Sequence, residues 1–373
     1  MSFKKGFIIS AVLVVLILTG AVVSMLQQYT DHTVLETVDI GDAGASKNED
    51  FEENVLRYTN DGAFFTDDSG NLIWNVTYEM DAPAFSRAGD YFVIYDKGGT
   101  AVVLMDRAGK VSSLQTLMPV VKATVSENGI LAVLLQQDTT GYVKLYDKRG
   151  QDVASGEFHA KNNGFPIEIG ISRDGKLLAV SLLQIIDGAV NTNINFYDFG
   201  ERGKSAIDNL VASFSYSNMV VPDIHFFLKD RMIAFGDTEF MIYDITGKPV
   251  VDEEMFLQGE VKAVFYNDNN FGTVTGETDE EGNYKNMMTI YSKTGRRRFE
   301  REINIPYKEV KLLSNNEIFA TDGNEALLFS AFGVRRFDQK FDGTIYEMFP
   351  RKGGRRYVVV KSSGMESIRL EKQ

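Results

Sequence analysis

The chain has 373 residues, a net charge of −13 and no cysteine. The charge argues against a protein that coats nucleic acid, because such proteins need clustered cations to displace counterions. The absence of cysteine excludes disulfides, thiolate metal sites and cysteine nucleophiles. Hydrophobic residues make up 44% of the chain, enough to bury a large core.

The first predicted element is a transmembrane helix over residues 7–26. This stretch carries no charge, and about 20 apolar residues are enough to cross a bilayer as a helix. Lys4 and Lys5 precede it, and no Lys or Arg follows it until Lys47. The positive-inside rule therefore predicts that the N-terminus is cytoplasmic and that the rest of the chain is extracytoplasmic. A cleaved signal peptide is the alternative interpretation of the apolar run.

The sequence predicts four regions along the chain. Residues 1–6 are the cytoplasmic N-terminus and residues 7–26 are the signal anchor. Residues 27–52 are polar and acidic and are predicted to form a tether. Residues 53–373 form the folded domain. This organisation predicts a single-pass membrane protein.

A repeated strand–turn–strand pattern sets the predicted fold of that domain. An aromatic-rich strand runs into a turn with Asp or Ser and Gly, and a second strand follows, as in residues 143–153 (VKLYDKRGQDV). The turn glycines recur at roughly the 40–50-residue period of propeller blades. They are Gly70, Gly109, Gly150, Gly203, Gly247, Gly295 and Gly333.

A second series of turns alternates with the first and precedes apolar strands. Its members are residues 86–95, 126–135, 172–181, 228–236, 267–275, 314–321 and 350–360. Each period then holds four strands, A to D, joined by tight turns. Seven members in each series predict an all-β, seven-bladed propeller. We expect strands near 345–360 to pair with strands near 63–76, so that the N- and C-terminal strands close the ring.

Short motifs resemble known propeller families. Residues 172–181 (SRDGKLLAVS) resemble the strand–turn–strand of WD-repeat and Tol-type propellers, and residues 67–74 (DDSGNLIW) resemble a turn of quinoprotein-like propellers. The layout of one anchor and one propeller is similar to uncharacterised membrane-bound propeller proteins of Gram-positive bacteria. A pair of β-sandwiches is the alternative all-β fold, but it gives no reason for two turn series at one period.

The sequence offers no catalytic constellation, no cofactor site and no metal site. The quinoprotein resemblance implies a tryptophan in each blade and cysteine contacts to the quinone, whereas this chain has one Trp and no Cys. The three histidines are far apart in sequence, and P-loop and nucleophile-elbow motifs are absent. An acidic loop at residues 279–283 is the nearest approach to a calcium loop, although such a loop is usually a solvated hairpin tip.

The predicted strands place charge of opposite sign on the two faces of the ring. The B–C turns carry an acidic rim that consists of Asp96, Asp138, Asp187, Asp237, Asp279 and Asp322. The opposite face carries a basic patch that consists of Arg296, Arg297, Arg298, Arg335, Arg336, Arg351, Lys352, Arg355 and Arg356. Turn preference of Asp and charge on outer strands are the plain structural explanations. The functional hypothesis is that the basic patch binds an anionic partner.

The D–A connections are predicted to place apolar side chains at the mouth of the central channel. These side chains are Leu117, Met118, Phe165, Met219 and Tyr307. Together these features favour a membrane-anchored binding module whose partner is a protein or an anionic envelope polymer. The alternative function is an envelope hydrolase or lyase that acts in the central channel.

Overall fold

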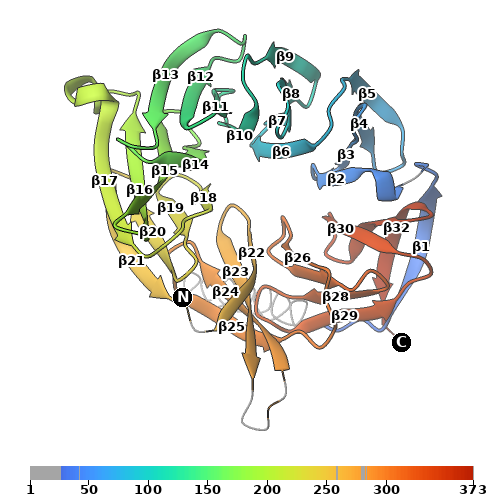
Figure 1. The fold of residues 1–373 in the computed structure, drawn as a ribbon. Coiled ribbons are helices and arrows are strands. Elements are labelled where there is room, and N and C mark those ends of the chain that lie inside the picture. Colours follow the sequence, from blue (N-terminus) through green and yellow to red (C-terminus); the bar gives the residue numbers. More distant parts are fainter. Residues whose placement is uncertain (1–26, 42, 258, 279–281, 283, 373) are drawn as a thin grey trace, which may run out of the picture.

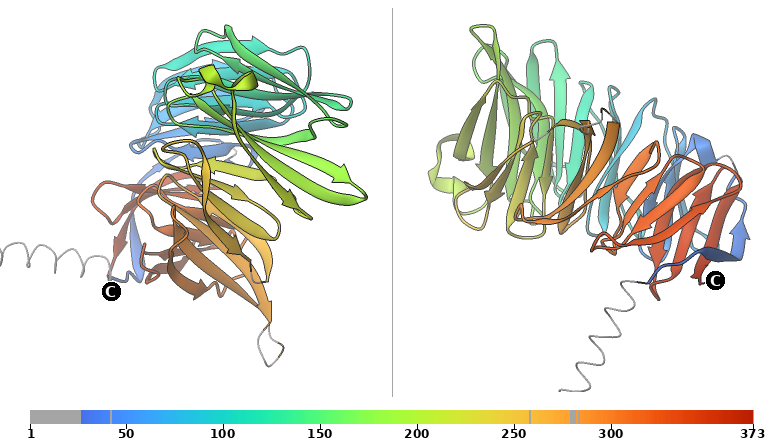
Figure 2. Two further views of the ribbon diagram at one scale, coloured as in Figure 1. Left: turned by 90° about the vertical axis from the view of Figure 1, so that its left-hand side faces the viewer. Right: turned by 90° about the horizontal axis from the view of Figure 1, so that it is seen from below.

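The computed structural model describes residues 27–41, 43–257, 259–278, 282 and 284–372. In these residues the chain forms eight four-stranded antiparallel sheets, the blades of a propeller, around a common axis (Figure 1). Side views show the blades standing next to one another around the ring (Figure 2). The predicted all-β propeller is confirmed, with eight blades instead of seven.

The first four blades follow one another along the chain, each running from the innermost strand A to the outermost strand D. Blade 1 consists of β2 (Lys47–Asp50), β3 (Asn54–Tyr58), β4 (Gly62–Asp67) and β5 (Leu72–Thr77). Blade 2 consists of β6 (Pro83–Ala88), β7 (Tyr91–Asp96), β8 (Ala101–Asp106) and β9 (Gly109–Gln115). Blade 3 consists of β10 (Val120–Val125), β11 (Leu131–Gln137), β12 (Thr140–Tyr146) and β13 (Asp152–His159). Blade 4 consists of β14 (Phe165–Ile171), β15 (Leu177–Ile186), β16 (Ala189–Asp198) and β17 (Leu210–Ser217).

The last four blades complete the ring. Blade 5 consists of β18 (Asp223–Phe226), β19 (Arg231–Phe235), β20 (Glu239–Asp244) and β21 (Val250–Phe256). Blade 6 consists of β22 (Glu260–Tyr266), β23 (Asn270–Thr278), β24 (Tyr284–Ser292) and β25 (Arg297–Glu302). Blade 7 consists of β26 (Glu309–Leu312), β27 (Ile318–Thr321), β28 (Glu325–Phe329) and β29 (Arg335–Lys340). Blade 8 consists of β30 (Ile345–Arg351), β31 (Arg356–Lys361), β32 (Gly364–Glu371) and, as its outermost strand, β1 (Asp31–Val38). Three short 3-10 helices, η1 (Ala43–Ala45), η2 (Gly203–Ser205) and η3 (Ile207–Asn209), lie in connections.

The sequence pattern of each strand follows from its place in the blade. Both faces of a blade pack against neighbouring blades, so the B strands are continuous apolar runs such as β11 (LAVLLQQ), whose first five residues are buried. Outermost strands meet solvent and are richer in charge, as in β25 (RRFERE). In the described residues the core consists of eight apolar clusters, one between each pair of adjacent blades.

The prediction of seven blades was wrong because one turn at the start of the series went unrecognised. The A–B turn of blade 1 lies at Phe51 to Asn54, where the amide of Phe51 donates to the carbonyl of Asn54 over 3.0 Å. Strand β2 before it has four residues, and its sequence KNED lacks an apolar run. The first turn and the last turn of the two series therefore belong to different blades, not to one shared blade.

The segment 27–52, predicted to be a tether, is part of the propeller. Strand β1 pairs with β32 from Asp31 opposite Glu371 to Val38 opposite Met365, and it lies on the outer edge of the last blade (Figure 1). The strands that pair at the closure are thus β1 and β32, not those near 63–76 and 345–360. Most of β1 is exposed, so it gives no amphipathic signal in the sequence.

The predicted transmembrane helix at residues 7–26 lies outside the described residues. Within the part of the chain that the structure describes, no helix has the length and apolar character needed to span a membrane.

The ring of blades has two faces. The A–B face carries the A–B and C–D turns, and the B–C face carries the B–C turns and the D–A connections.

Candidate functional site

The predicted basic patch lies on the A–B face of blades 6 to 8, but its members have different environments. The Arg351 side chain is only 7% exposed and forms ion pairs with Asp50 (2.8 Å from Nη1 to Oδ1) and Asp68 (2.6 Å from Nε to Oδ1). Arg336 is buried as well; it pairs with Glu317 of its own blade and donates to the Gly354 carbonyl of blade 8 over 3.0 Å. These two arginines hold blades together and are not accessible to a ligand.

The other seven cations of the basic patch fall into two groups, those that form an ion pair and those that do not. Three have an acidic neighbour on the surface: Arg297 with Glu300, Arg335 with Asp338 and Lys352 with Glu53. Four are exposed and form no ion pair within the described part of the chain. These four are Arg296, Arg298, Arg355 and Arg356, and we call them the arginine sector.

The five described members of the acidic rim lie at the B–C ends of their blades, and several have local roles. The Asp96 carboxylate is buried and accepts a hydrogen bond from the Ala82 amide over 2.8 Å. Asp322 accepts from two amides of its own turn. Asp138 and Asp187 have φ of 51° and 52°, a conformation that Asp adopts more readily than most residues. Asp279 lies outside the described residues, as do most residues of the acidic loop at 279–283.

The B–C face also exposes large apolar side chains, most of which the sequence analysis missed. Leu117 is 95% exposed in a D–A connection, as predicted, whereas Met219 is buried. The exposed apolar residues at B–C tips and D–A ends of blades 2 to 6 are Leu117, Ile185, Ile186, Val190, Phe256 and Tyr284. Hairpins such as β15–β16 are long enough to carry apolar residues beyond the core, and that extra length is the signal that could have identified them.

A shallow hollow of about 640 Å³ lies on the B–C face between blades 2 and 3. Its walls come from the B–C turns of both blades and from the start of β10. They include Lys97, Pro119, Gln136 and Asp138. Leu117 is two residues from Pro119, so an exposed apolar side chain stands beside the hollow.

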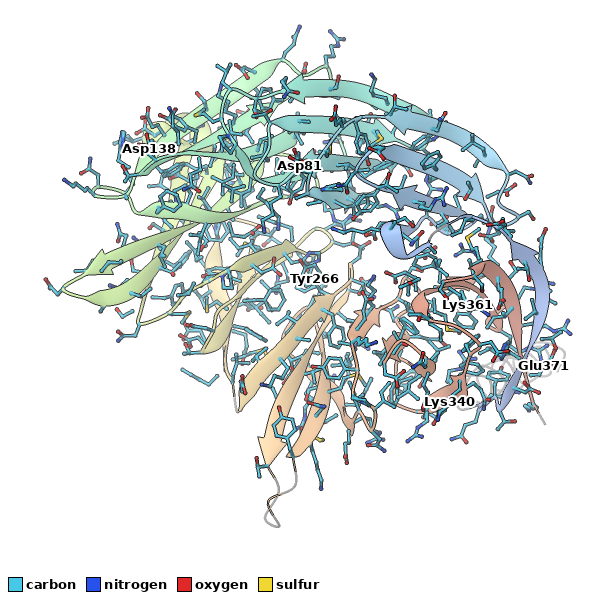
Figure 3. All side chains as sticks on the ribbon, turned by 45° about the vertical axis from the view of Figure 1, so that its right-hand side comes forward. Asp81, Asp138, Tyr266, Lys340, Lys361 and Glu371 are labelled. Carbon is cyan, nitrogen blue, oxygen red and sulfur yellow. The ribbon has the colours of Figure 1, made fainter. Side chains whose placement is uncertain are left out.

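The innermost strands carry a ring of ionisable groups that the sequence analysis did not identify. Each blade contributes at least one from its A strand, and the ring consists of Glu49, Arg87, Lys122, Glu168, Asp223, Tyr266, Lys311 and Glu347. Figure 3 shows Tyr266 near the middle of the ring, whereas Asp138 lies at a hairpin tip. Three contacts join members of the ring. Lys122 Nζ lies 2.9 Å from Glu168 Oε1, and the Tyr266 hydroxyl donates to Asp223 Oδ1 over 3.4 Å. Lys311 forms an ion pair with Glu347. A charged residue within each short A strand is the signal in the sequence.

Burial raises the pKa of several acids in this ring. It raises the pKa of Glu168 to about 7 and that of Glu347 to about 8, even though a lysine contacts each carboxylate and opposes the shift. Burial also raises the pKa of Asp223. Lys122, Glu168 and Glu347 each come directly after a β-bulge in their strand, and bulges re-aim side chains. The contacts join blades 3–4, 5–6 and 7–8, so the ring ties neighbouring blades together.

Among curated proteins, none matches the sequence. The profile of the Family of unknown function (DUF5711) matches residues 25–370. The chain belongs to this family. Among solved structures, this family member is similar to BamB from Moraxella catarrhalis, with 12% identity and a TM-score of 0.51 over 91% of this chain and 100% of that chain. It is also similar to Sqt1 from Chaetomium thermophilum, with 13% identity and a TM-score of 0.55 over 91% of this chain and 98% of that chain.

At these identities the likeness establishes the propeller fold and no more. The predicted resemblance to propeller proteins is confirmed at that level. The relation to membrane-bound propellers of Gram-positive bacteria stays a prediction.

Proposed function

We propose that this DUF5711 member is a membrane-anchored, extracytoplasmic binding module that docks a protein partner on the B–C face of its propeller. The observation that carries the proposal is the combination on that face of exposed apolar side chains with the hollow between blades 2 and 3. Leu117 is 95% exposed, Phe256 is 78% exposed and Ile185 is 75% exposed. Exposed apolar groups at rigid hairpin ends are typical of surfaces that a partner covers.

Charge on the same face supports a partner with basic groups around an apolar contact. Asp138, Asp187 and Asp237 are exposed at B–C tips, so this face carries negative charge as well as exposed apolar side chains. An apolar centre with a charged rim is the usual anatomy of a protein interface. The hollow beside Leu117 adds a concave site for one large side chain of the partner.

The catalytic alternative receives less support from the geometry. The hollow contains none of the ionisable groups of the inner strands, and the acids with the strongest pKa shifts are each in contact with a lysine of the neighbouring blade. Those contacts explain the acids as ties between blades. A binding function therefore fits the described residues better than a hydrolase or lyase.

Crosslinked capture from cells that express the full chain tests the proposed face. The variant pair Leu117→Asp and Phe256→Asp should lose the captured partner, because each change places a charge in the apolar contact. Both residues are exposed, so we expect the free energy of unfolding to change by less than about 0.5 kcal/mol. Ile207→Asp is the matched control, because Ile207 is 86% exposed on the A–B face. Equal capture by all variants would contradict the proposal.

A further inference from the structure

The chain enters the propeller beside the arginine sector. Tyr29 is buried, and its amide donates to the Arg336 carbonyl over 2.7 Å at the C–D end of blade 7. The Arg336 guanidinium in turn donates to the Gly354 carbonyl over 3.0 Å. Gly354 directly precedes Arg355. These contacts fix the entry point on the A–B face, next to Arg355 and Arg356 of the arginine sector.

The distance between this entry point and the apolar run is short. Three peptide units join Leu26, the last residue of the run, to Tyr29, and three residues extend at most about 10 Å. The polar layer on each side of a bilayer is about 5–8 Å thick. A run that spans a bilayer therefore keeps the entry point at Tyr29 within about 10 Å of the headgroup layer. The tilt of the propeller on that point depends on its surface contacts.

The turns of blades 6 and 7 lack a negative charge that the earlier blades carry. In blades 1 to 5 the C–D turn begins with an aspartate that accepts hydrogen bonds from amides of the turn. These aspartates are Asp67, Asp106, Asp147, Asp198 and Asp244. In blades 6 and 7 the position holds Ser292 and Ser330, and Ser330 Oγ accepts from the amides of Phe332 and Val334. A neutral hydroxyl thus closes the same turn without the carboxylate.

An exposed aromatic side chain lies within the same sector. Phe332 is 56% exposed at the tip of the C–D turn of blade 7, between the arginines of blades 6 and 8. Aromatic and arginine side chains together are typical of surfaces at the membrane interface. We propose that the arginine sector and Phe332 dock the propeller on the anionic phospholipid surface from which the chain emerges, which directs the B–C face away from the membrane. This inference rests on the proposed anchor at residues 7–26.

The arginine sector is strong enough to set the orientation. Each arginine close to an anionic lipid surface favours the docked state by about fivefold. Four unpaired arginines then favour it by several hundred-fold in total, and the effect falls with ionic strength because salt screens exposed charges. A soluble anionic polymer could use the same charges, so the experiment must separate the two.

The test uses the full chain reconstituted in phosphatidylcholine vesicles with or without phosphatidylglycerol. Because the chain has no cysteine, Ala331→Cys places one fluorophore in the arginine sector, and Ile185→Cys places one on the B–C face. With phosphatidylglycerol, a quencher on the lipid headgroup should quench the fluorophore at 331 and leave the fluorophore at 185 unaffected. Arg→Glu at all four positions of the arginine sector should abolish this quenching. Arg149→Glu, an exposed control on blade 3 of the same face, should not.

Three results would overturn the inference. Quenching at 331 that is independent of phosphatidylglycerol and of the arginines would show that the short connection alone sets the distance. Quenching at 185 would show the opposite orientation. Displacement by soluble polyphosphate with no response to phosphatidylglycerol would assign the arginines to an anionic polymer. Partner capture through Leu117 and Phe256 is measured separately, so each proposal can fail while the other stands.

Discussion

Replacement of Arg351 by methionine should loosen the joint between the last blade and the first. The Arg351 side chain is 7% exposed and lies at the end of β30, the innermost strand of blade 8. It pairs with Asp50 at the end of the innermost strand of blade 1 and with Asp68 in the outer turn of that blade. The apolar cluster between blades 8 and 1 is one of the smaller ones in the ring, so these ion pairs are an important part of the joint.

The expected loss of stability follows from the burial of the three groups. Removal of one partner from a fully buried ion pair costs about 3–5 kcal/mol, because the charge that remains is buried without compensation. Here Asp50 is 16% exposed and Asp68 is 31% exposed. Water can therefore reach both carboxylates in part. We expect Arg351→Met to lower the free energy of unfolding by about 2–3 kcal/mol.

Urea unfolding of the full chain, followed by tryptophan fluorescence, measures this loss, because Trp74 lies in blade 1. Lys352→Met is the matched control. Lys352 pairs with Glu53, but both side chains are exposed, and such pairs contribute about 0–1 kcal/mol. Further replacement of Asp50 and Asp68 by asparagine should restore part of the loss in Arg351→Met. A loss no larger than that of Lys352→Met would refute the reasoning.

Two further predictions concern the closure and the inner strands. Gly364→Ala should destabilise the chain and speed proteolysis of β1, because Gly364 has φ of 132° and a Cβ there would lie 2.4 Å from the Val38 carbonyl oxygen; Gly247→Ala, which has free space, is the control, and equal proteolysis would contradict the prediction. Glu168→Gln should reduce the fall in stability as the pH rises from about 4.5 to about 7. Burial raises the pKa of Glu168 in the folded chain, so its contribution is complete below the unfolded pKa and is lost as pH rises through the folded pKa of about 7. Unfolding midpoints across this range that change in parallel in both proteins would show that Glu168 does not cause the change.

The architecture was largely predictable from the sequence because B strands and turns leave strong local signals. A buried B strand such as β11 is apolar along its length, and Gly or Asp marks the tight turns. The number of blades was not predictable from the same signals. Strand β1 lies at the outer edge, where little packs against it, and β2 is too short to show a period. The strands that raise the number of blades from seven to eight, β1 and β2, therefore lie in the acidic segment that was predicted to be a tether.

The sequence indicated on which face the candidate residues lie, but not whether their side chains are buried or form ion pairs. Turn order alone placed the basic patch on the face opposite to the acidic rim. It could not show that Arg351 is buried, because its partners Asp50 and Asp68 are about 300 residues away in sequence. Nor could it show that Arg296 and Arg355 form no ion pair in the described residues. Pairing depends on contacts between blades, and the repeat pattern holds no information about them.

The pairing of β1 with β32 has a consequence for biosynthesis. Strand β1 is made first but meets its partner last, because Asp31 pairs with Glu371. At about 5–20 residues per second, the ribosome needs roughly 20–70 s to make the chain between them. During that time β1 is an unpaired strand, and unpaired strands aggregate when they are apolar and uncharged. In the sequence DHTVLETV, the exposed charges of Asp31 and Glu36 should disfavour aggregation of the strand before β32 is available to pair with it.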